Sequence, residues 1–260
     1  MLILSPSKMA RYFLHLSYLG SNYHGWQRQP NSITVQEVIE AAIRQLGIAH
    51  DGILGCGRTD TGVHASNFYA HVDLTSLNDP SAFQFQLNAV LPQDIAIAEV
   101  IAVKDDAHAR FDASERQYKY SIHRLKNPLH YGRSLLCHQA LDIEALNAAS
   151  EYLIGRQEFT SFARMQSAQK HDFCDVRTAS WSAIDDQLIF EISANRFLRN
   201  MVRAIVGTLL DIGKGKMPPE AIKEVIAAKE RSAAGSSAAA HGLSLDRVEY
   251  PYIGRHVSTD

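Results

Sequence analysis

The sequence predicts an α+β fold built from two similar α/β halves with mainly antiparallel sheets. Segments in which apolar and polar residues alternate, as in strands, are interspersed with segments of helical periodicity along the 260 residues. Short polar links join several of the strand pairs, as in antiparallel sheets. The second half then repeats the element content of the first. We expect the halves to span 9–108 and 109–260, with residues 1–8 forming a disordered extension.

The first half opens with an aromatic-rich, alternating run, which is typical of a strand. Ser32 or Thr34 is a suitable N-cap for the helix that follows, and Gly47 ends it. Two apolar strand segments then flank a glycine-rich loop. The predicted elements of this half are a strand at 11–19, a helix at 34–46, strands at 53–54 and 68–72, a helix from Pro80 to Leu87, and a strand at 94–103.

The second half shows the same alternation. Its predicted elements are a strand at 117–123, a helix at 142–154 ending before Gly155, a hairpin of 176–183 with 188–194, a long amphipathic helix at 197–212, and a helix at 218–228. Arg196, Arg199 and Arg203 have the spacing i, i+3 and i+7, which places them on one face of the long helix.

The composition matches that of globular enzymes, with 46% hydrophobic and 21% charged residues. No apolar run approaches the roughly 18 residues of a membrane helix, and the apolar start is too short for a secretory signal. The three cysteines contain no close pair, so neither a disulfide framework nor a zinc site is expected. The default location is cytoplasmic.

The net charge of −2 does not indicate a nucleic-acid-binding protein. Basic residues nevertheless gather in two stretches, which either line one electropositive face or are ordinary solvated charges. The first stretch is Arg110, Arg116, Lys119 and Arg124, and the second is Arg196, Arg199, Arg203, Lys214 and Lys216.

The segment GCGRTDTGVHA, residues 55–65, carries the strongest signal for a site. Its three glycines permit strained backbone and close approach of a ligand. Arg58 lies two residues before Asp60 and favours the ionised carboxylate, so Asp60 is a candidate nucleophile or base. An ordinary Asp-Gly turn is the alternative. Asp60-Thr61-Gly62 also resembles an aspartic-protease signature, but Arg58 disfavours the shared proton that such a dyad needs.

Two further segments contain residues suited to RNA. Residues 23–30, YHGWQRQP, interleave aromatic side chains with Gln27 and Arg28 after the first strand. Such residues stack on unpaired bases and bind phosphates, although Trp26 alternatively covers the edge of the core. Tyr118 lies in a predicted strand, where its spacing indicates a buried side chain. No metal-ligand spacing and no nucleotide-binding glycine motif is present.

Together these segments resemble the tRNA pseudouridine synthase A family, whose catalytic loop usually reads GAGRTDAGVHA. Cys56 and Thr61 stand where alanine is usual. The resemblance covers nearly the whole chain after residue 8. Its supporting motifs are YHGWQRQ, LNAVLPQDIAI, HARFDASERQYKY, FTSFA and NRFLRNMVRAIVGTLL.

The resemblance implies a pseudouridine synthase fold, with the halves around a central active-site cleft. It implies an isomerase that converts uridine to pseudouridine at about tRNA positions 38, 39 and 40, without cofactor or metal, as a homodimer. Asp60 matches the essential aspartate, and Arg58 matches a residue that helps to extrude the base. Tyr118 matches a tyrosine that stacks on uracil, and Arg203 matches the arginine that pairs with the aspartate.

Phosphate contacts are expected from Arg28, Arg196, Arg199 and Lys214, with Gln27 as a further substrate contact. The rival hypothesis is a catalytically silent RNA-binding protein on the same scaffold. The set Arg58, Asp60, Tyr118 and Arg203 favours the enzyme, because a protein that only binds RNA has no chemical need of all four.

Overall fold

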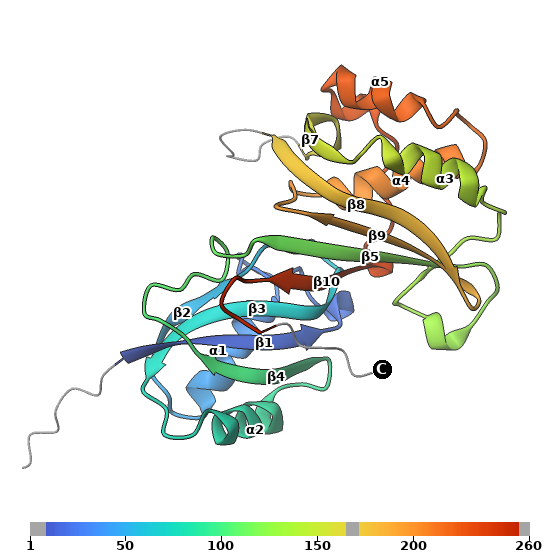
Figure 1. Ribbon diagram of the computed structural model, residues 1–260. Coiled ribbons are helices and arrows are strands. Elements are labelled where there is room, and N and C mark those ends of the chain that lie inside the picture. The colour runs from blue at the N-terminus through green and yellow to red at the C-terminus, as the bar shows by residue number, and fades with distance from the viewer. Residues whose placement is uncertain (1–8, 165–171, 255–260) are drawn as a thin grey trace, which may run out of the picture. The chain divides into compact units, whose positions relative to one another are not determined.

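The structure is a computed structural model that describes residues 9–164 and 172–254. The chain forms two compact units, one drawn from Met1–Ser114 and Val248–Asp260 and the other from Glu115–Arg247 (Figure 1). Each unit combines antiparallel strands with helices, which confirms the α+β class. The predicted extension at 1–8 lies outside the described residues. A division into functional halves after residue 108 stays a prediction.

Among its described residues, the first unit contains four antiparallel strands of its own and two α-helices. Its strands are β1 (Met9–Tyr18), β2 (His50–Gly55), β3 (His64–Thr75) and β4 (Ile95–Ala102). β1 lies between β3 and β4, and β2 also pairs with β3. The helices α1 (Val35–Gln45) and α2 (Pro80–Val90) contact each other and pack on β2 and β4, respectively.

Side-chain caps fix the ends of these two helices. The Thr34 hydroxyl accepts a hydrogen bond from the Glu37 amide at the start of α1, and Gly47, with φ of 73°, follows its end. Asp79 accepts two backbone N–H groups of the first turn of α2, in which Pro80 has no N–H to lose. Both helix starts agree with the sequence-based prediction.

The second unit contains a sheet in the order β10-β5-β9-β8-β7, and β6 pairs parallel with β5. Its strands are β5 (Glu115–His123), β6 (Leu135–Leu136), β7 (Gly155–Glu158), β8 (Phe173–Ile184), β9 (Gln187–Ala194) and β10 (Leu243–Glu249). The last two residues of β10 belong to the first unit. β8 and β9 form the predicted hairpin, turning at Asp185 with φ of 52°. Its helices are α3 (Ile143–Glu151), α4 (Met201–Gly213) and α5 (Ala221–Ala228), of which α3 contacts both β8 and α4 (Figure 1).

The start of α4 corrects one prediction. The helix was expected from residue 197, but it begins at Met201, after Asn200 in the left-handed region with φ of 67°. Such a residue cannot lie inside a right-handed helix. Arg196 and Arg199 therefore precede the helix, and only Arg203 lies on it. The predicted common helix face of the three arginines is wrong.

Two expectations about the whole sequence can be compared with the described residues. Cys56, Cys137 and Cys174 are buried free thiols. Within 9–164 and 172–254, no helix has the length and apolar character required to cross a membrane.

Candidate functional site

The Asp60 loop joins β2 to β3, as predicted. Asp60 is half-buried and Arg58 is exposed, while Thr59 between them is buried. The hydroxyl oxygens of Thr59 and Tyr18 lie 2.9 Å apart and share a hydrogen bond. Alternation about this anchor holds Thr59 inside and leaves its neighbours, Arg58 and Asp60, accessible. The loop therefore presents the Arg58 cation and the Asp60 carboxylate on either side of the buried Thr59.

The turn after β1 braces this loop through backbone contacts. The Gly20 amide donates to His64 Nδ1 (2.9 Å), and the Gly62 amide donates to the Tyr23 carbonyl (3.3 Å). Gly25 has φ of 86°, and a Cβ there would lie 2.3 Å from the Thr59 carbonyl oxygen. Only glycine permits both this backbone and this approach. The turn and the Asp60 loop are thus in direct contact within the first unit.

The aromatic residues of the turn belong to the core. Tyr23 is 5% exposed and Trp26 is 2% exposed. The Trp26 ring stacks on Phe68 with centroids 4.1 Å apart, and Gly55 leaves room for its indole. Of the two alternatives for Trp26, packing against the core is correct, and Tyr23 is buried as well. Neither is available as a stacking platform for a base.

Gln27 and Arg28 of the same turn are exposed. Arg28 forms an ion pair with Glu40, whose side chain is only 4% exposed. Gln36 Nε2 also donates to the Glu40 carboxylate (2.9 Å). A buried carboxylate requires such partners, because desolvation of an unpaired charge is costly. Arg28 therefore stabilises the buried Glu40 carboxylate, in addition to any contact with phosphate.

A pocket of about 120 Å³ adjoins the Asp60 loop in the first unit. Arg58, Arg110 and Gln27 line it, together with Trp26, Gln36, Ile53, Leu54, Gly55 and Gly57. Two arginines and two glutamines thus line one small pocket, a residue set that suits an anion. The sequence-based site did not include Arg110, although it lies in the quoted segment HARFDASERQYKY.

Tyr118 lies on β5 of the second unit, opposite Ile192 of β9. Its side chain is half-buried and makes an edge-to-face contact with Phe197 (centroids 5.1 Å apart, 89° between planes). Tyr120, two residues further, is the fully buried tyrosine and donates to the Ala239 carbonyl (2.9 Å). Spacing alone therefore overstated the burial of Tyr118.

Arg203 lies in the first turn of α4 and is held by residues 234–239, here called the strap segment. Its Nε donates to the Ala238 carbonyl (2.8 Å), and the Ala238 amide donates to the Arg203 carbonyl (2.9 Å). A Cβ at Gly207 would lie 1.7 Å from the Ser236 oxygen. The strap segment thus crosses α4 in direct contact with its backbone. It fixes the direction of the Arg203 side chain.

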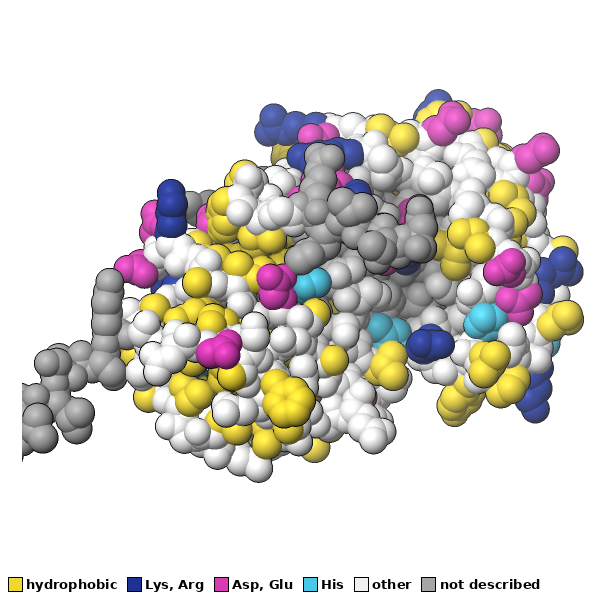
Figure 2. Space-filling model, turned by 60° about the horizontal axis from the view of Figure 1, so that its bottom comes forward, with side chains coloured by type: hydrophobic (Ala, Val, Ile, Leu, Met, Phe, Trp, Pro, Cys, Tyr) yellow, Lys and Arg dark blue, Asp and Glu magenta, His cyan; other side chains and the backbone are white. Residues whose placement is uncertain are grey.

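The remaining basic candidates are separated from one another. Arg196 is half-buried and Arg199 is exposed in the loop before α4. Lys214 caps the other end of α4. Eleven residues separate it from Arg203, or roughly 16 Å along a helix. On the face drawn in Figure 2, Lys and Arg side chains likewise form separate groups between polar and hydrophobic surface.

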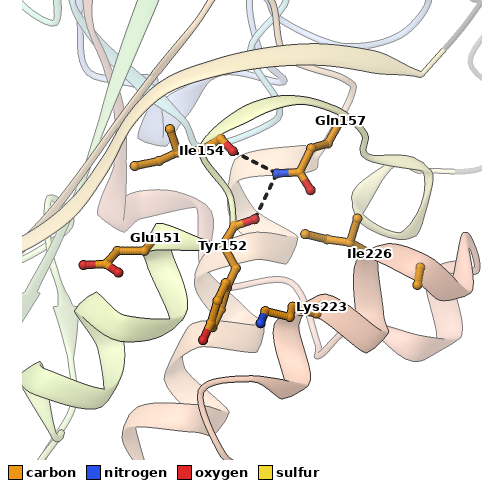
Figure 3. Close-up of a pocket in the computed structure, with 7 residues that line it drawn as sticks. Glu151, Tyr152, Ile154, Gln157, Lys223 and Ile226 are labelled. Atoms are coloured by element: carbon orange, nitrogen blue, oxygen red, sulfur yellow. Dashed lines mark hydrogen bonds between the residues drawn. The ribbon is translucent and has the colours of Figure 1, made fainter.

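A second, larger pocket of about 440 Å³ lies in the second unit. It is lined from the end of α3, from β7 and its lead-in, and from α5, and Lys223 Nζ lies 4.0 Å from the centre of the Tyr152 ring (Figure 3). Gln157 Nε2 donates to the carbonyls of Tyr152 and Ile154. None of the candidate residues lines this pocket, so size is a poor guide to the site here.

Asp60 and Arg58 belong to the first unit, and Tyr118 and Arg203 belong to the second. Within the described parts of both, no group of three or more His, Cys, Asp or Glu side chains is placed to hold a metal ion.

The sequence profile of the tRNA pseudouridine synthases matches residues 15–112 and 149–251. A tRNA pseudouridine synthase A of Porphyromonas gingivalis is 44% identical over 247 residues, covering 94% of this chain and 98% of the relative. That of Bacteroides thetaiotaomicron is also 44% identical, covering 94% and 91%. That of Francisella tularensis subsp. holarctica is 39% identical, covering 94% and 95%. Identity at this level along both units, with the Asp60 loop inside the matched range, places the chain in the tRNA pseudouridine synthase family.

Proposed function

We propose that this protein converts uridine to pseudouridine at about positions 38, 39 and 40, in the anticodon stem-loop of tRNA. The observation that carries the proposal is Asp60, half-buried on a braced loop beside an exposed Arg58. Family membership over 15–112 and 149–251 supplies the substrate class, tRNA, and the reaction, an isomerisation.

The reaction rearranges bonds without net gain or loss of atoms. The N1–C1′ glycosidic bond breaks, the uracil turns, and a bond forms between its C5 and C1′. The proton on C5 is lost and N1 gains one, so the product is an isomer and no oxidant is consumed. Asp60 acts at C1′, at C6, or as the base that removes a C2′ proton. Each role requires an accessible carboxylate near the sugar.

The target base must leave its stack before Asp60 can reach the ribose, at a cost of a few kcal/mol. Arg58 is exposed two residues from Asp60, so its long side chain is available to occupy the space that the base leaves. Tyr118 is proposed to stack on the extruded uracil or to handle its C5 proton. Arg203 is proposed to orient the Asp60 carboxylate. These last two roles rest on the family motifs.

The proposed tRNA contacts are Gln27, Arg28, Arg196, Arg199 and Lys214. Their separation along the chain suits a long anionic ligand better than a small one. Neutralising phosphates releases counterions, so tRNA affinity should fall as salt rises. The tRNA crosses two subunits of a homodimer in this proposal. The proposed location is cytoplasmic, because folded tRNA, the substrate, is used there.

The decisive experiment incubates purified protein with unmodified tRNA transcripts and no added cofactor. Pseudouridine is mapped by carbodiimide-dependent primer stops. We expect stops at about positions 38–40. Asp60→Asn removes the charge at nearly constant volume, so turnover should fall by several orders of magnitude. Its tRNA affinity should change by less than about tenfold, or about 1.4 kcal/mol.

Substantial turnover by Asp60→Asn would contradict the proposed role of this residue. Tight tRNA binding by the wild-type protein without any pseudouridine would instead identify a silent RNA-binding protein.

A further inference from the structure

The segment around Arg110 is fixed by histidine acceptors in the first unit. His108 Nδ1 accepts hydrogen bonds from the amides of Arg110 (3.1 Å) and Phe111 (3.3 Å). His71 Nδ1 accepts from the amide of Ala109 (3.1 Å). Burial lowers the pKa of His71 to about 4, with His108 as the next cause, so its ring stays a neutral acceptor at physiological pH. Three consecutive amides are thereby satisfied by side chains.

The other side of the segment is held by a carboxylate and two tyrosines. Asp112 Oδ2 accepts from the His108 amide (2.7 Å) and from the Tyr252 hydroxyl (2.6 Å). The Tyr250 hydroxyl donates to the Ala109 carbonyl (2.5 Å). A loop with this many fixed groups loses little entropy when it binds a ligand. Its exposed side chains are therefore presented in a defined position.

Phe111 is a large apolar side chain that this loop exposes to solvent. It is 75% exposed, although its ring contacts the His108 imidazole (centroids 4.2 Å apart). The Arg110 guanidinium lies 5.8 Å from the Phe111 ring centre. An aromatic ring beside an arginine is the combination on which nucleic-acid bases stack and to which their phosphates bind. Solvent exposure of such a ring has no benefit for folding.

The position of the pair indicates which ligand it meets. Arg110 and Arg58 line the same pocket of about 120 Å³, next to the loop that carries Asp60. Two cations at one pocket attract a phosphate more strongly than either does alone. A phosphate held there would lie beside the loop that carries Asp60, within reach of the strand that presents a nucleotide to it. Bases near an extruded nucleotide have lost a stacking neighbour.

From this arrangement we infer that Arg110 and Phe111 form a second RNA contact, for a nucleotide adjacent to the target uridine. Phe111 stacks on the unpaired face of its base, and Arg110 together with Arg58 binds the intervening phosphate. The inference rests on the proposed function for the identity of the RNA. It assigns a function to the start of the segment HARFDASERQYKY, whose later part carries the catalytic candidate Tyr118.

The first test measures equilibrium binding of tRNA transcripts in the Asp60→Asn background, so that chemistry does not interfere. Phe111→Ala should weaken affinity about 5- to 100-fold, equivalent to roughly 1 to 3 kcal/mol for one stacked base. Phe111→Tyr should recover most of that loss because it restores the ring. Phe85, on α2 of the same unit, is 77% exposed and is the matched control. Phe85→Ala should bind tRNA like the parent.

The second test measures the salt dependence of binding. Arg110→Gln should reduce the slope of log affinity against log salt by about 1, as expected for one lost phosphate contact. Melting temperatures within error of the parent establish that each variant is folded. Equal affinities for Phe111→Ala and Phe85→Ala, or an unchanged salt slope for Arg110→Gln, would overturn the inference.

Failure of the proposed function gives a different pattern. In that case the wild-type protein makes no pseudouridine, yet Phe111→Ala still loses tRNA affinity. The contact then stands and the catalytic assignment falls. If Phe111→Ala leaves the affinity for tRNA unchanged but abolishes binding of another protein, the RNA contact is wrong.

Discussion

At the scale of single residues, Tyr118 has two proposed roles, and only one of them requires its hydroxyl oxygen. Its ring makes an edge-to-face contact with Phe197 and is only half-buried, so part of it is available to a base. Its hydroxyl is the part that can transfer a proton. Stacking needs the ring alone, whereas proton handling at C5 needs the oxygen.

Tyr118→Phe therefore distinguishes the two roles. If stacking dominates, we expect turnover within about tenfold of the wild type, because the ring remains. If proton handling dominates, we expect a loss of about 10²-fold or more with tRNA affinity unchanged. Single-turnover rates and binding on the same transcript provide the measurement. Tyr118→Leu is the control, since it lacks both functions and should bind the extruded base poorly.

Some residue-level features were predictable and others were not. Glycines, Arg58 and Asp60 stand next to one another in the sequence, so local pattern alone located the loop. The burial of Trp26 depends on Phe68, more than forty positions away along the chain, and on the gap that Gly55 leaves. Sequence pattern contains no record of such a contact. The sequence is therefore compatible with Trp26 either stacking on a base or packing against the core.

At the scale of elements, two helix starts were predicted where a side chain caps the helix, and the start of α4 was missed, where Asn200 precedes the helix without a side-chain cap. Thr34 and Asp79 are adjacent to α1 and α2, and both starts were found. Asn200 delays α4 by adopting a left-handed backbone, and its side chain donates to Ser237 in the strap segment (2.7 Å). That partner is distant in sequence. The apolar periodicity of residues 197–200 consequently indicated four helical residues too many.

The contact between α4 and the strap segment supports a prediction about stability. Gly207→Ala should lose about 2 kcal/mol or more, because the new Cβ displaces backbone at Ser236 and outweighs a helix-propensity gain of about 1 kcal/mol. Gly213→Ala on the same helix meets only the movable Leu146 side chain and should stay within about 1 kcal/mol of the wild type. Urea denaturation of both variants measures the difference. A Gly207→Ala protein as stable as Gly213→Ala would contradict the close approach.

The histidines beneath the Arg110 segment predict a pH dependence. Burial lowers the folded-state pKa of His71 to about 4, below its ordinary value near 6.5. Between these values the unfolded chain binds more protons, so stability should fall as pH falls from about 6.5 to 4, by up to about 1.4 kcal/mol per pH unit. His71→Gln should flatten this slope in urea titrations, leaving the part due to His108 and His123, whose pKa values burial also lowers.

At the scale of the whole molecule, the chain returns to its first unit after completing the second. Residues 248–254, the last that the structure describes, belong with the unit that begins the chain. In this return segment, the Tyr250 hydroxyl donates a hydrogen bond to the Ala109 carbonyl, and the Tyr252 hydroxyl donates one to the Asp112 carboxylate. The sequence-based halves could not include this return, because tyrosines at a chain end show no periodicity that identifies their partners. Length and element content predicted two α+β bodies, but not which segment closes the first.

The proposed homodimer is also tested at this scale. If the tRNA must cross two subunits, the protein should sediment as a dimer at micromolar concentration. Its activity should fall when dilution produces monomer. Sedimentation velocity at several concentrations, paired with turnover at the same concentrations, is the measurement. Full turnover by a monomeric species would refute the requirement for a partner subunit.

The chain contains two tryptophans, and the structure places one in each unit, as Trp26 and Trp181. Both are buried, so the emission of each should shift to the red when its own unit unfolds. Trp181 Nε1 is a buried donor without an acceptor among the described residues, and Trp181→Phe removes that unsatisfied group. The resulting protein carries a single tryptophan, packed against the Asp60 loop through Gly55. With selective excitation of tryptophan, its emission reports on the first unit alone, and a comparison with circular dichroism of the whole chain shows whether the two units unfold in one step or two.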